Sequence, residues 1–117
     1  MATAELKSAL QTASEIEITV TGRRTGRDIS NLVWFVEAGD RLHLLPVGGA
    51  ESDWYRNVLK TPTIRIAAGG AEATAETTPI TDPETVNDIF EAFRAKYGAD
   101  VDRYYPKRDV AVQVPLG

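Results

Sequence analysis

The sequence has 117 residues, a formal net charge of -4 at pH 7 and no cysteine. Its length predicts one domain over residues 1–117, and its negative charge argues against general binding to nucleic acids or anionic membranes. Without cysteine, disulfides and thiolate chemistry are excluded, and one histidine cannot form a cluster, so we expect no metal site. No segment resembles a membrane span or a signal peptide, which predicts a soluble, cytoplasmic protein without stable membrane insertion.

The first elements in chain order are a helix and two strands. Residues 2–13 carry apolar side chains at helical spacing, and residues 16–21 alternate between apolar and polar side chains, as a half-buried strand does. A basic loop, residues 22–27, leads to a second strand at residues 28–37. Because residues 32–36 are apolar on both faces, we expect this strand at the centre of the fold.

A Gly-Asp turn at residues 39–40 predicts a hairpin into a third strand, residues 41–47. His43 lies in this strand, and we interpret it as a structural residue at the rim rather than a catalytic one. After Gly49, helical spacing predicts a short helix that ends at Pro62.

A second predicted hairpin joins strands at residues 63–67 and 71–80 through a Gly-Gly turn. A long helix is predicted to follow it. Thr81 and Glu84 have the spacing of a capping box, and an apolar stripe continues at helical spacing up to Gly98.

After an irregular segment, residues 99–106, the last strand is expected at residues 108–114, and its face with Ala111 and Gln113 is expected to be half-exposed or to line a groove. The pattern is thus six strands, mostly joined by hairpins, with an N-terminal helix and one long helix before the last strand. Strands that follow each other without crossover helices predict a mainly β protein, and the economical architecture is a small antiparallel barrel.

Two glycine-rich loops are candidate anion sites. Arg23, Arg24 and Arg27 lie close together in the basic loop, and arginine forks bind phosphate or carboxylate at two points. The amides around Gly48 and Gly49 precede a helix N-terminus, whose dipole also favours anions. The alternative for the basic loop is a solvated surface without a ligand.

The segments TGRRTGR and VGGAESDWYRNVLKTPTIRI, with strands between and after them, resemble the deazaflavin-dependent nitroreductase family. That family belongs to the split β-barrel flavin and deazaflavin oxidoreductases. The resemblance implies a six-stranded antiparallel split β-barrel of the FMN-binding type. It also implies hydride transfer from the reduced deazaflavin coenzyme F-420 to a quinone, nitro or enone-type acceptor.

The resemblance further implies a cofactor groove. Its candidate cofactor-binding positions are Arg23, Arg24, Thr25, Gly26, Arg27, Val47, Gly48, Gly49, Trp54 and Tyr55. Trp54 has a second interpretation, core packing, which its helical spacing with Val58 favours, and Tyr55 is then the residue that reaches the ligand.

Tyr104 and Tyr105 are the candidate catalytic residues. They lie in the one long connection left after the hairpins are assigned, and such a connection can cross the open groove of a split barrel. One ring can cover the cofactor, and one phenol can donate a hydrogen bond or a proton to the acceptor. The alternative is that one ring only plugs the end of the barrel.

The chain departs from the family at Pro46 and Val47, where many members have a serine and a lysine or asparagine, and at Arg56, where many have a histidine. Two other functions stay open. One is an FMN-binding reductase, because a phosphate loop does not distinguish FMN from a deazaflavin. The other is a non-catalytic binder of an apolar ligand such as a lipid or haem, which Val47 and the Trp34-Phe35 pair suggest. The expected partner is a small-molecule acceptor, and a homodimer across the barrel stays open.

Overall fold

The computed structural model describes residues 4–116, and this part of the chain forms eight strands and four α-helices. The strands are β1 (Ile16–Thr21), β2 (Asp28–Val33), β3 (Phe35–Ala38), β4 (Arg41–Leu44), β5 (Thr63–Ala68), β6 (Ala71–Glu76), β7 (Thr78–Ile80) and β8 (Ala111–Pro115). The helices are α1 (Ala4–Thr12), α2 (Asp53–Lys60), α3 (Pro83–Tyr97) and α4 (Asp100–Tyr104), with a 3-10 turn η1 (Gly49–Glu51) before α2. No described helix has the length and apolar character needed to cross a membrane.

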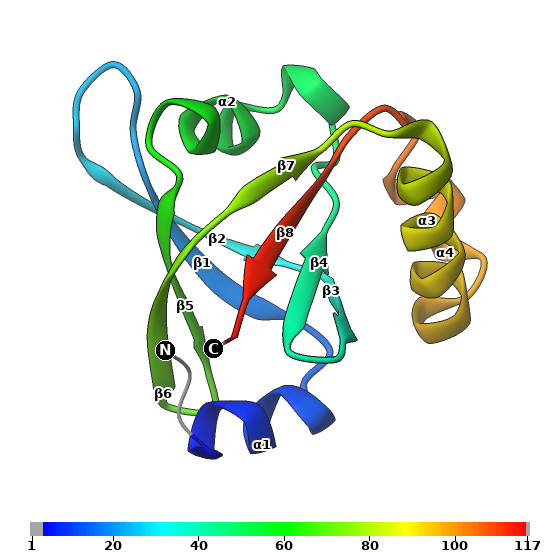
Figure 1. Ribbon diagram of the computed structural model, residues 1–117, viewed down its shortest axis with the longest axis horizontal. Helices are drawn as coiled ribbons and strands as arrows, with labels where there is room; N and C mark the ends of the chain where they lie inside the picture. The colour runs from blue at the N-terminus through cyan, green and yellow to red at the C-terminus, as the bar shows by residue number, and fades with distance from the viewer. Residues whose placement is uncertain (1–3, 117) are drawn as a thin grey trace.

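The strands form two antiparallel sheets of four (Figure 1). The first sheet has the order β2-β1-β5-β6 and the second has the order β3-β4-β8-β7. Within the described chain no strand pairing joins the two sheets, so they do not close into a barrel. The expected mainly β, six-stranded antiparallel barrel is therefore wrong, and the fold is a mixed α/β one that is split-barrel-like.

The strand count was wrong because two expected strands are each divided where the chain passes from one sheet to the other. The segment 28–37 becomes β2 and β3, which separate at Trp34, and the segment 71–80 becomes β6 and β7, which separate at Thr77. The buried Thr77 fixes its crossing, because its amide and its Oγ1 both donate to the Pro62 carbonyl, at 2.9 and 2.7 Å.

The expected central position of the strand at residues 28–37 is also wrong. β2 lies at the edge of the first sheet, paired with β1 in the register Ile18 with Asn31, and Leu32 is 65% exposed. The Gly-Asp and Gly-Gly hairpins are confirmed, since β3 pairs with β4 and β5 with β6.

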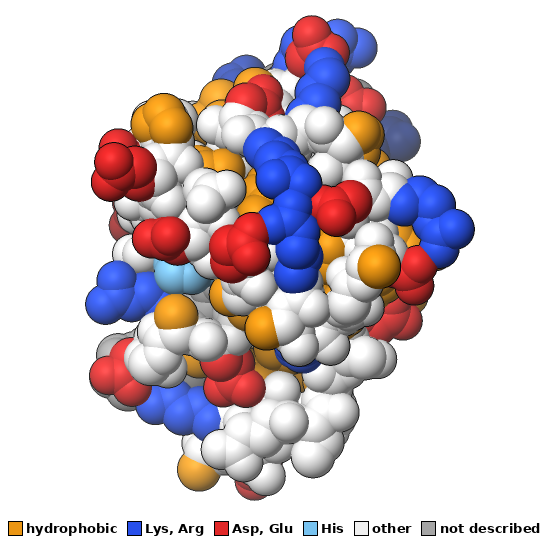
Figure 2. Space-filling view, turned by 90° about the vertical axis from the view of Figure 1, so that its right-hand side faces the viewer, with side chains coloured by type: hydrophobic (Ala, Val, Ile, Leu, Met, Phe, Trp, Pro, Cys, Tyr) orange, Lys and Arg blue, Asp and Glu red, His pale blue; other side chains and the backbone are white. Residues whose placement is uncertain are grey.

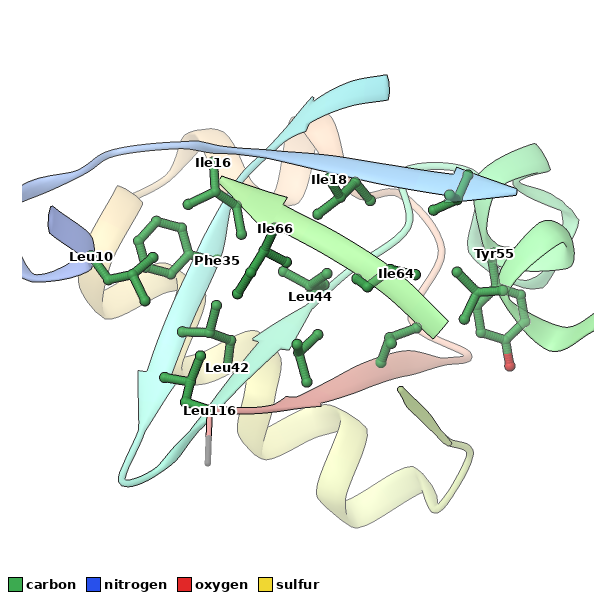
Figure 3. Packing of buried hydrophobic residues seen from close by; sticks show 14 of the residues in the cluster. Leu10, Ile16, Ile18, Phe35, Leu42, Leu44, Tyr55, Ile64, Ile66 and Leu116 are labelled. Carbon is green, nitrogen blue, oxygen red and sulfur yellow. The ribbon is translucent and has the colours of Figure 1, made fainter. Parts of the chain in front are cut away.

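The main core lies between the sheets. Figure 3 shows side chains from both sheets converging, with Leu10 and Phe35 toward one end and Tyr55 toward the other. Burying each such side chain contributes roughly 1.5–3 kcal/mol. Helices α1 and α2 cover opposite ends of the sandwich (Figure 1). Residues 2 and 3 of the helix expected at 2–13 lie outside the described residues, and α1 confirms the rest up to Thr12.

A second core packs α3 and α4 on the outer face of the second sheet. Val36, Leu45 and Ala111 point to this side and meet Phe90 and Phe93 of α3. The face of the last strand with Ala111 and Gln113 was expected to be half-exposed or to line a groove. Gln113 is half-buried, but the expectation is wrong at Ala111, which the second core buries fully. On the outside of this helical layer, acidic and basic side chains are interleaved (Figure 2).

The two helices of this layer differ from expectation in detail. Asp82, and not Thr81, caps α3, because its Oδ2 accepts hydrogen bonds from the amide and hydroxyl of Thr85 at 3.0 and 2.7 Å. The segment expected to be irregular contains α4, which Asp102 ties to α3 by accepting from Arg94 Nε at 3.1 Å.

Candidate functional site

A cleft of about 420 Å³ opens where β2 extends past the edge of the second sheet. Asn31 and Val33 pair with Ile18 and Ile16 of β1, share their face of the sheet and line the cleft. The cleft is lined among others by Asn31, Trp34, Val47, Trp54, Tyr104 and Tyr105. Four aromatic rings from three separate segments therefore meet in one cavity.

Trp34 is the central ring of this wall. It stacks on Tyr97 with ring centroids 4.2 Å apart and planes 6° apart, and its centroid lies 5.0 Å from that of Tyr104 in an edge contact. The Tyr97 hydroxyl lies 2.8 Å from the Ser14 carbonyl and accepts from the Phe35 amide at 3.0 Å. Burial raises the pKa of Tyr97. Through these hydrogen bonds and the ring stack, Tyr97 fixes the position of Trp34 at the crossing between the two sheets.

The two candidate catalytic tyrosines both line the cleft, in different environments. Tyr105 is 4% exposed, packs its ring against Phe93 and Trp34, and has its pKa raised by burial. Tyr104 is 52% exposed, so its phenol remains open to the cleft and to solvent. Of the pair, Tyr104 has the geometry to touch a ligand, and its catalytic role stays a prediction.

Helix α2 supplies one cofactor-site candidate to the cleft and one to the core. Trp54 is half-buried, packs on the main core and also lines the cleft, so core packing is observed and contact with a cofactor stays a prediction. Tyr55 is 3% exposed and points into the core at the α2 end (Figure 3). It does not line the cleft, whereas Val47, which is 53% exposed, does.

The basic loop folds onto α2 through Arg23. The Arg23 amide and guanidinium both donate to Asn57 Oδ1, at 3.0 and 2.9 Å, and a second guanidinium nitrogen lies 3.2 Å from Asp53 Oδ1. Lys60 Nζ donates to the Arg23 carbonyl at 2.8 Å. Sequence reasoning missed this anchoring role, and the available signal was Asn57, three residues after Trp54 in the segment VGGAESDWYRNVLKTPTIRI.

The first part of the basic loop borders a second cavity, which we call the arginine hollow. It measures about 220 Å³ and is lined by the loop from Gly22 to Thr25 together with Ile29, Asp53 and Asn57. Within residues 4–116 the guanidinium groups of Arg24 and Arg27 make no hydrogen bond or ion pair, and both residues are exposed.

The arginine hollow lies beside the cleft. Ile29 of the hollow and Asn31 of the cleft share one face of β2, and Asp53 and Trp54 are neighbours on α2.

The turn at residues 46–52, here called the glycine turn, does not offer the free amides that the sequence suggested. The Gly48 amide donates to Ser52 Oγ at 2.9 Å, and the Gly49 amide donates to the Pro46 carbonyl at 3.0 Å. The Ala50 amide donates to Asp109 Oδ2 at 3.2 Å. All three donors are satisfied within the chain.

His43 has a structural environment, as expected from the sequence. It is half-buried on the outer face of the second sheet opposite Gln113, and burial lowers its pKa. It does not line the cleft. Among the described residues no three histidine or carboxylate side chains converge to hold a metal ion.

The cleft and the arginine hollow together fit a flat aromatic ligand with an anionic tail. The volume of the cleft lies within the range of about 300–1,000 Å³ common for small-molecule sites. Trp34, Trp54 and Tyr104 supply faces and edges for stacking. Arg24 and Arg27 supply exposed guanidinium groups. The glycine turn does not fit a phosphate, because its donors are used.

Comparison with known proteins identifies a family. A sequence model of the family described as "Uncharacterized protein conserved in bacteria (DUF2255)" matches residues 5–111. A search of curated proteins finds no match to the sequence.

Solved structures share the fold at low sequence identity. An F-420-H2-dependent reductase (FDR-A) is 17% identical with a TM-score of 0.68, over 86% of this chain and 93% of that one. The heme storage protein HutZ from Vibrio cholerae is 15% identical with a TM-score of 0.73, over 98% and 90%. A domain-swapped dimer is 17% identical with a TM-score of 0.68, over 86% and 79%. At these identities the likeness shows the fold alone.

Proposed function

The chain belongs to the DUF2255 family of proteins conserved in bacteria, and we propose that it is an oxidoreductase that holds a flat aromatic redox cofactor in the cleft. The first candidate cofactor is the deazaflavin F-420 and the second is FMN. The observation that carries the proposal is the cleft walled by Trp34, Trp54 and Tyr104, beside the arginine hollow that the exposed Arg24 lines. The likeness to a reductase that uses F-420-H2 supports it.

The hydride in such a reaction would come from the reduced cofactor, so the protein supplies binding, orientation and exclusion of water. Trp34 is held in place by its stack on Tyr97 and offers an apolar ring to the ligand. Arg24 and Arg27 hold the anionic tail through charge-assisted hydrogen bonds of about 1.5–3 kcal/mol each.

The acceptor is proposed to be a quinone, nitro or enone-type small molecule that enters the open side of the cleft next to Tyr104. The exposed phenol of Tyr104 can donate a hydrogen bond to the acceptor oxygen as negative charge develops there. Tyr105 instead fixes the end of α4 by packing on Phe93, so it positions Tyr104.

The test uses the two tryptophans of the chain, Trp34 and Trp54, which both line the cleft. Titration of the purified protein with F-420, FMN and haem, followed by tryptophan fluorescence, should show saturable quenching by one of the first two. Turnover is then measured with that cofactor in its reduced form and a benzoquinone acceptor. Tyr104→Phe should lower the turnover rate several-fold with nearly unchanged cofactor affinity, because the phenol acts in the transition state. If a cofactor binds saturably but no quinone, nitro or enone-type acceptor is reduced, the proposal that the protein is an enzyme is refuted.

A non-catalytic binder of an apolar ligand is the second candidate. It is favoured by the exposed apolar side chains of Val47 and Leu32, which are 53% and 65% exposed at the cleft. The likeness to a heme storage protein makes haem the natural probe. However, His43 does not line the cleft, so a histidine ligand to iron is not available there.

Dimerisation is a separate proposal. It is supported by the likeness to a domain-swapped dimer and by exposed apolar side chains of β2, Ile29 at 41% and Leu32 at 65%. Light scattering on the purified chain, with Leu32→Ser as the variant, measures it. A monomer at every concentration would contradict it.

A further inference from the structure

The segment that joins α4 to β8 carries a carboxylate onto the glycine turn. Asp109 Oδ2 accepts the hydrogen bond of the Ala50 amide at 3.2 Å. The carboxylate also covers Gly49, where a methyl group would overlap Asp109 Oδ1 and would lie 2.9 Å from Lys107 Cβ. A negatively charged side chain thus occupies the position at which an external anion would meet this turn.

The chain segment that carries Asp109 is fixed on both sides of this residue. Lys107 Nζ donates to Glu51 Oε2 at 2.8 Å, which ties the joining segment to the same turn. The next residue, Val110, is 7% exposed and belongs to the main core. Burial raises the pKa of Tyr55, and the negative charge of Asp109 raises it further.

The glycine turn contributes two residues to the lining of the cleft, Val47 and Ser52. Lys107 pairs with Glu51, and Asp109 adds to this turn a negative charge that has no ion-pair partner among the described residues. Arg24, by contrast, lines the arginine hollow with an exposed guanidinium group, and Arg27 lies in the same loop. A ligand with a neutral ring and an anionic tail therefore meets repulsion at one end of the cleft and attraction at the other.

We infer that Asp109 is a specificity-determining residue that closes the glycine turn to phosphate and carboxylate groups. The anionic tail of a cleft ligand is thereby directed to the arginine hollow. The second statement rests on the proposed function, because it requires a ligand in the cleft. The first is a property of the turn itself and is tested without such a ligand.

The experiment for the turn is an NMR titration of the ¹⁵N-labelled full chain with inorganic phosphate. In the wild type, amide shifts should appear in the basic loop around Arg24 and Arg27 and not at Ala50. In Asp109→Ala, the Ala50 amide should shift, with phosphate affinity at this turn raised by about tenfold. Asp109→Asn keeps the size of the side chain and removes its charge, so it should give a smaller gain in a protein that stays folded.

Two results would overturn the closure of the turn. One is a phosphate-induced shift of Ala50 in the wild type as strong as in Asp109→Ala. The other is no gain in affinity at Ala50 in either Asp109 variant.

The experiment for the tail compares FMN with riboflavin, which share the ring and differ by the phosphate. In the wild type FMN should bind more tightly, and Arg24→Ala combined with Arg27→Ala should remove that advantage. If FMN still binds more tightly than riboflavin in this double variant, the inference that Arg24 and Arg27 hold the anionic tail is overturned. If none of FMN, riboflavin and F-420 binds, the assignment of the anionic tail to the arginine hollow fails together with the proposed function, while the phosphate titration still decides the role of Asp109.

Discussion

The arginines of the basic loop should differ sharply in their effect on stability, although the sequence presents them as equivalent. Arg23→Ala removes a charged hydrogen bond of 2.9 Å to Asn57, which is 3% exposed. Hydrogen bonds to charged groups contribute about 1.5–3 kcal/mol. The ion pair with Asp53 adds little, because the Asp53 side chain is 88% exposed and such pairs contribute about 0–1 kcal/mol. We therefore expect a loss of about 2–3 kcal/mol in the free energy of unfolding.

A loss of that size should lower the melting temperature by roughly 5–15 °C in a domain of this length. The matched control is Arg24→Ala, whose guanidinium makes no hydrogen bond or ion pair among residues 4–116, and we expect its stability to change by less than about 0.5 kcal/mol. Asn57→Ala should cost more than Arg23→Ala, because the Arg23 amide then also loses its acceptor.

Thermal and urea unfolding followed by circular dichroism measure these differences. Equal melting temperatures for Arg23→Ala and Arg24→Ala would refute the view that Arg23 anchors the loop on α2.

Three further predictions concern the glycine turn and the pH dependence of stability. Gly49→Ala should destabilise the protein by about 1 kcal/mol more than Gly70→Ala in urea unfolding, since both have positive φ but only Gly49 is crowded by its neighbours. Burial raises the pKa of Tyr105 above the usual 10.0, so the contribution of this residue to stability is complete below pH 10 and is lost as the pH rises further. Tyr105→Phe should therefore make the free energy of unfolding less dependent on pH above 10. An unchanged pH dependence would contradict this. Hydrogen bonds from Thr85 lower the pKa of Asp82 below 3.8, so the contribution of Asp82 to stability is present above that pH and is lost as the pH falls through the lowered pKa. Asp82→Ala should lower the melting temperature at pH 7 and make the melting temperature less dependent on pH in acid.

The local elements could be predicted from the sequence because they depend on local patterns. The alternation at residues 16–21 and the apolar stripe that includes Phe90 and Phe93 have the periods of a strand and a helix, and the structure has both. The crossing at Trp34 could not be predicted. A chain that leaves one sheet and enters another presents apolar residues to both sides in succession, which is also the pattern of a central strand.

The site was predictable in part for the same reason. The sequence indicated Tyr104 and Tyr105 as site residues because they lie in the long connection before the last strand, and both line the cleft. The roles of Asn57 and Asp109 depend on hydrogen bonds to residues 34 and 59 positions away in the sequence. No local pattern specifies such contacts, so the anchoring of the loop and the occupied amide of the glycine turn required the structure.

The most direct test of the ligand-binding cleft compares Tyr104→Ala with Leu59→Ala. The two side chains are similarly exposed, at 52% and 50%, but only Tyr104 lines the cleft. With F-420 or FMN and tryptophan fluorescence as the readout, Tyr104→Ala should weaken binding by about tenfold, since loss of an aromatic contact costs about 0.5–1.5 kcal/mol beyond the buried area. Leu59→Ala should bind as the wild type does. Equal affinities for both variants, or no saturable quenching in the wild type, would contradict the assignment of the cleft as the cofactor site.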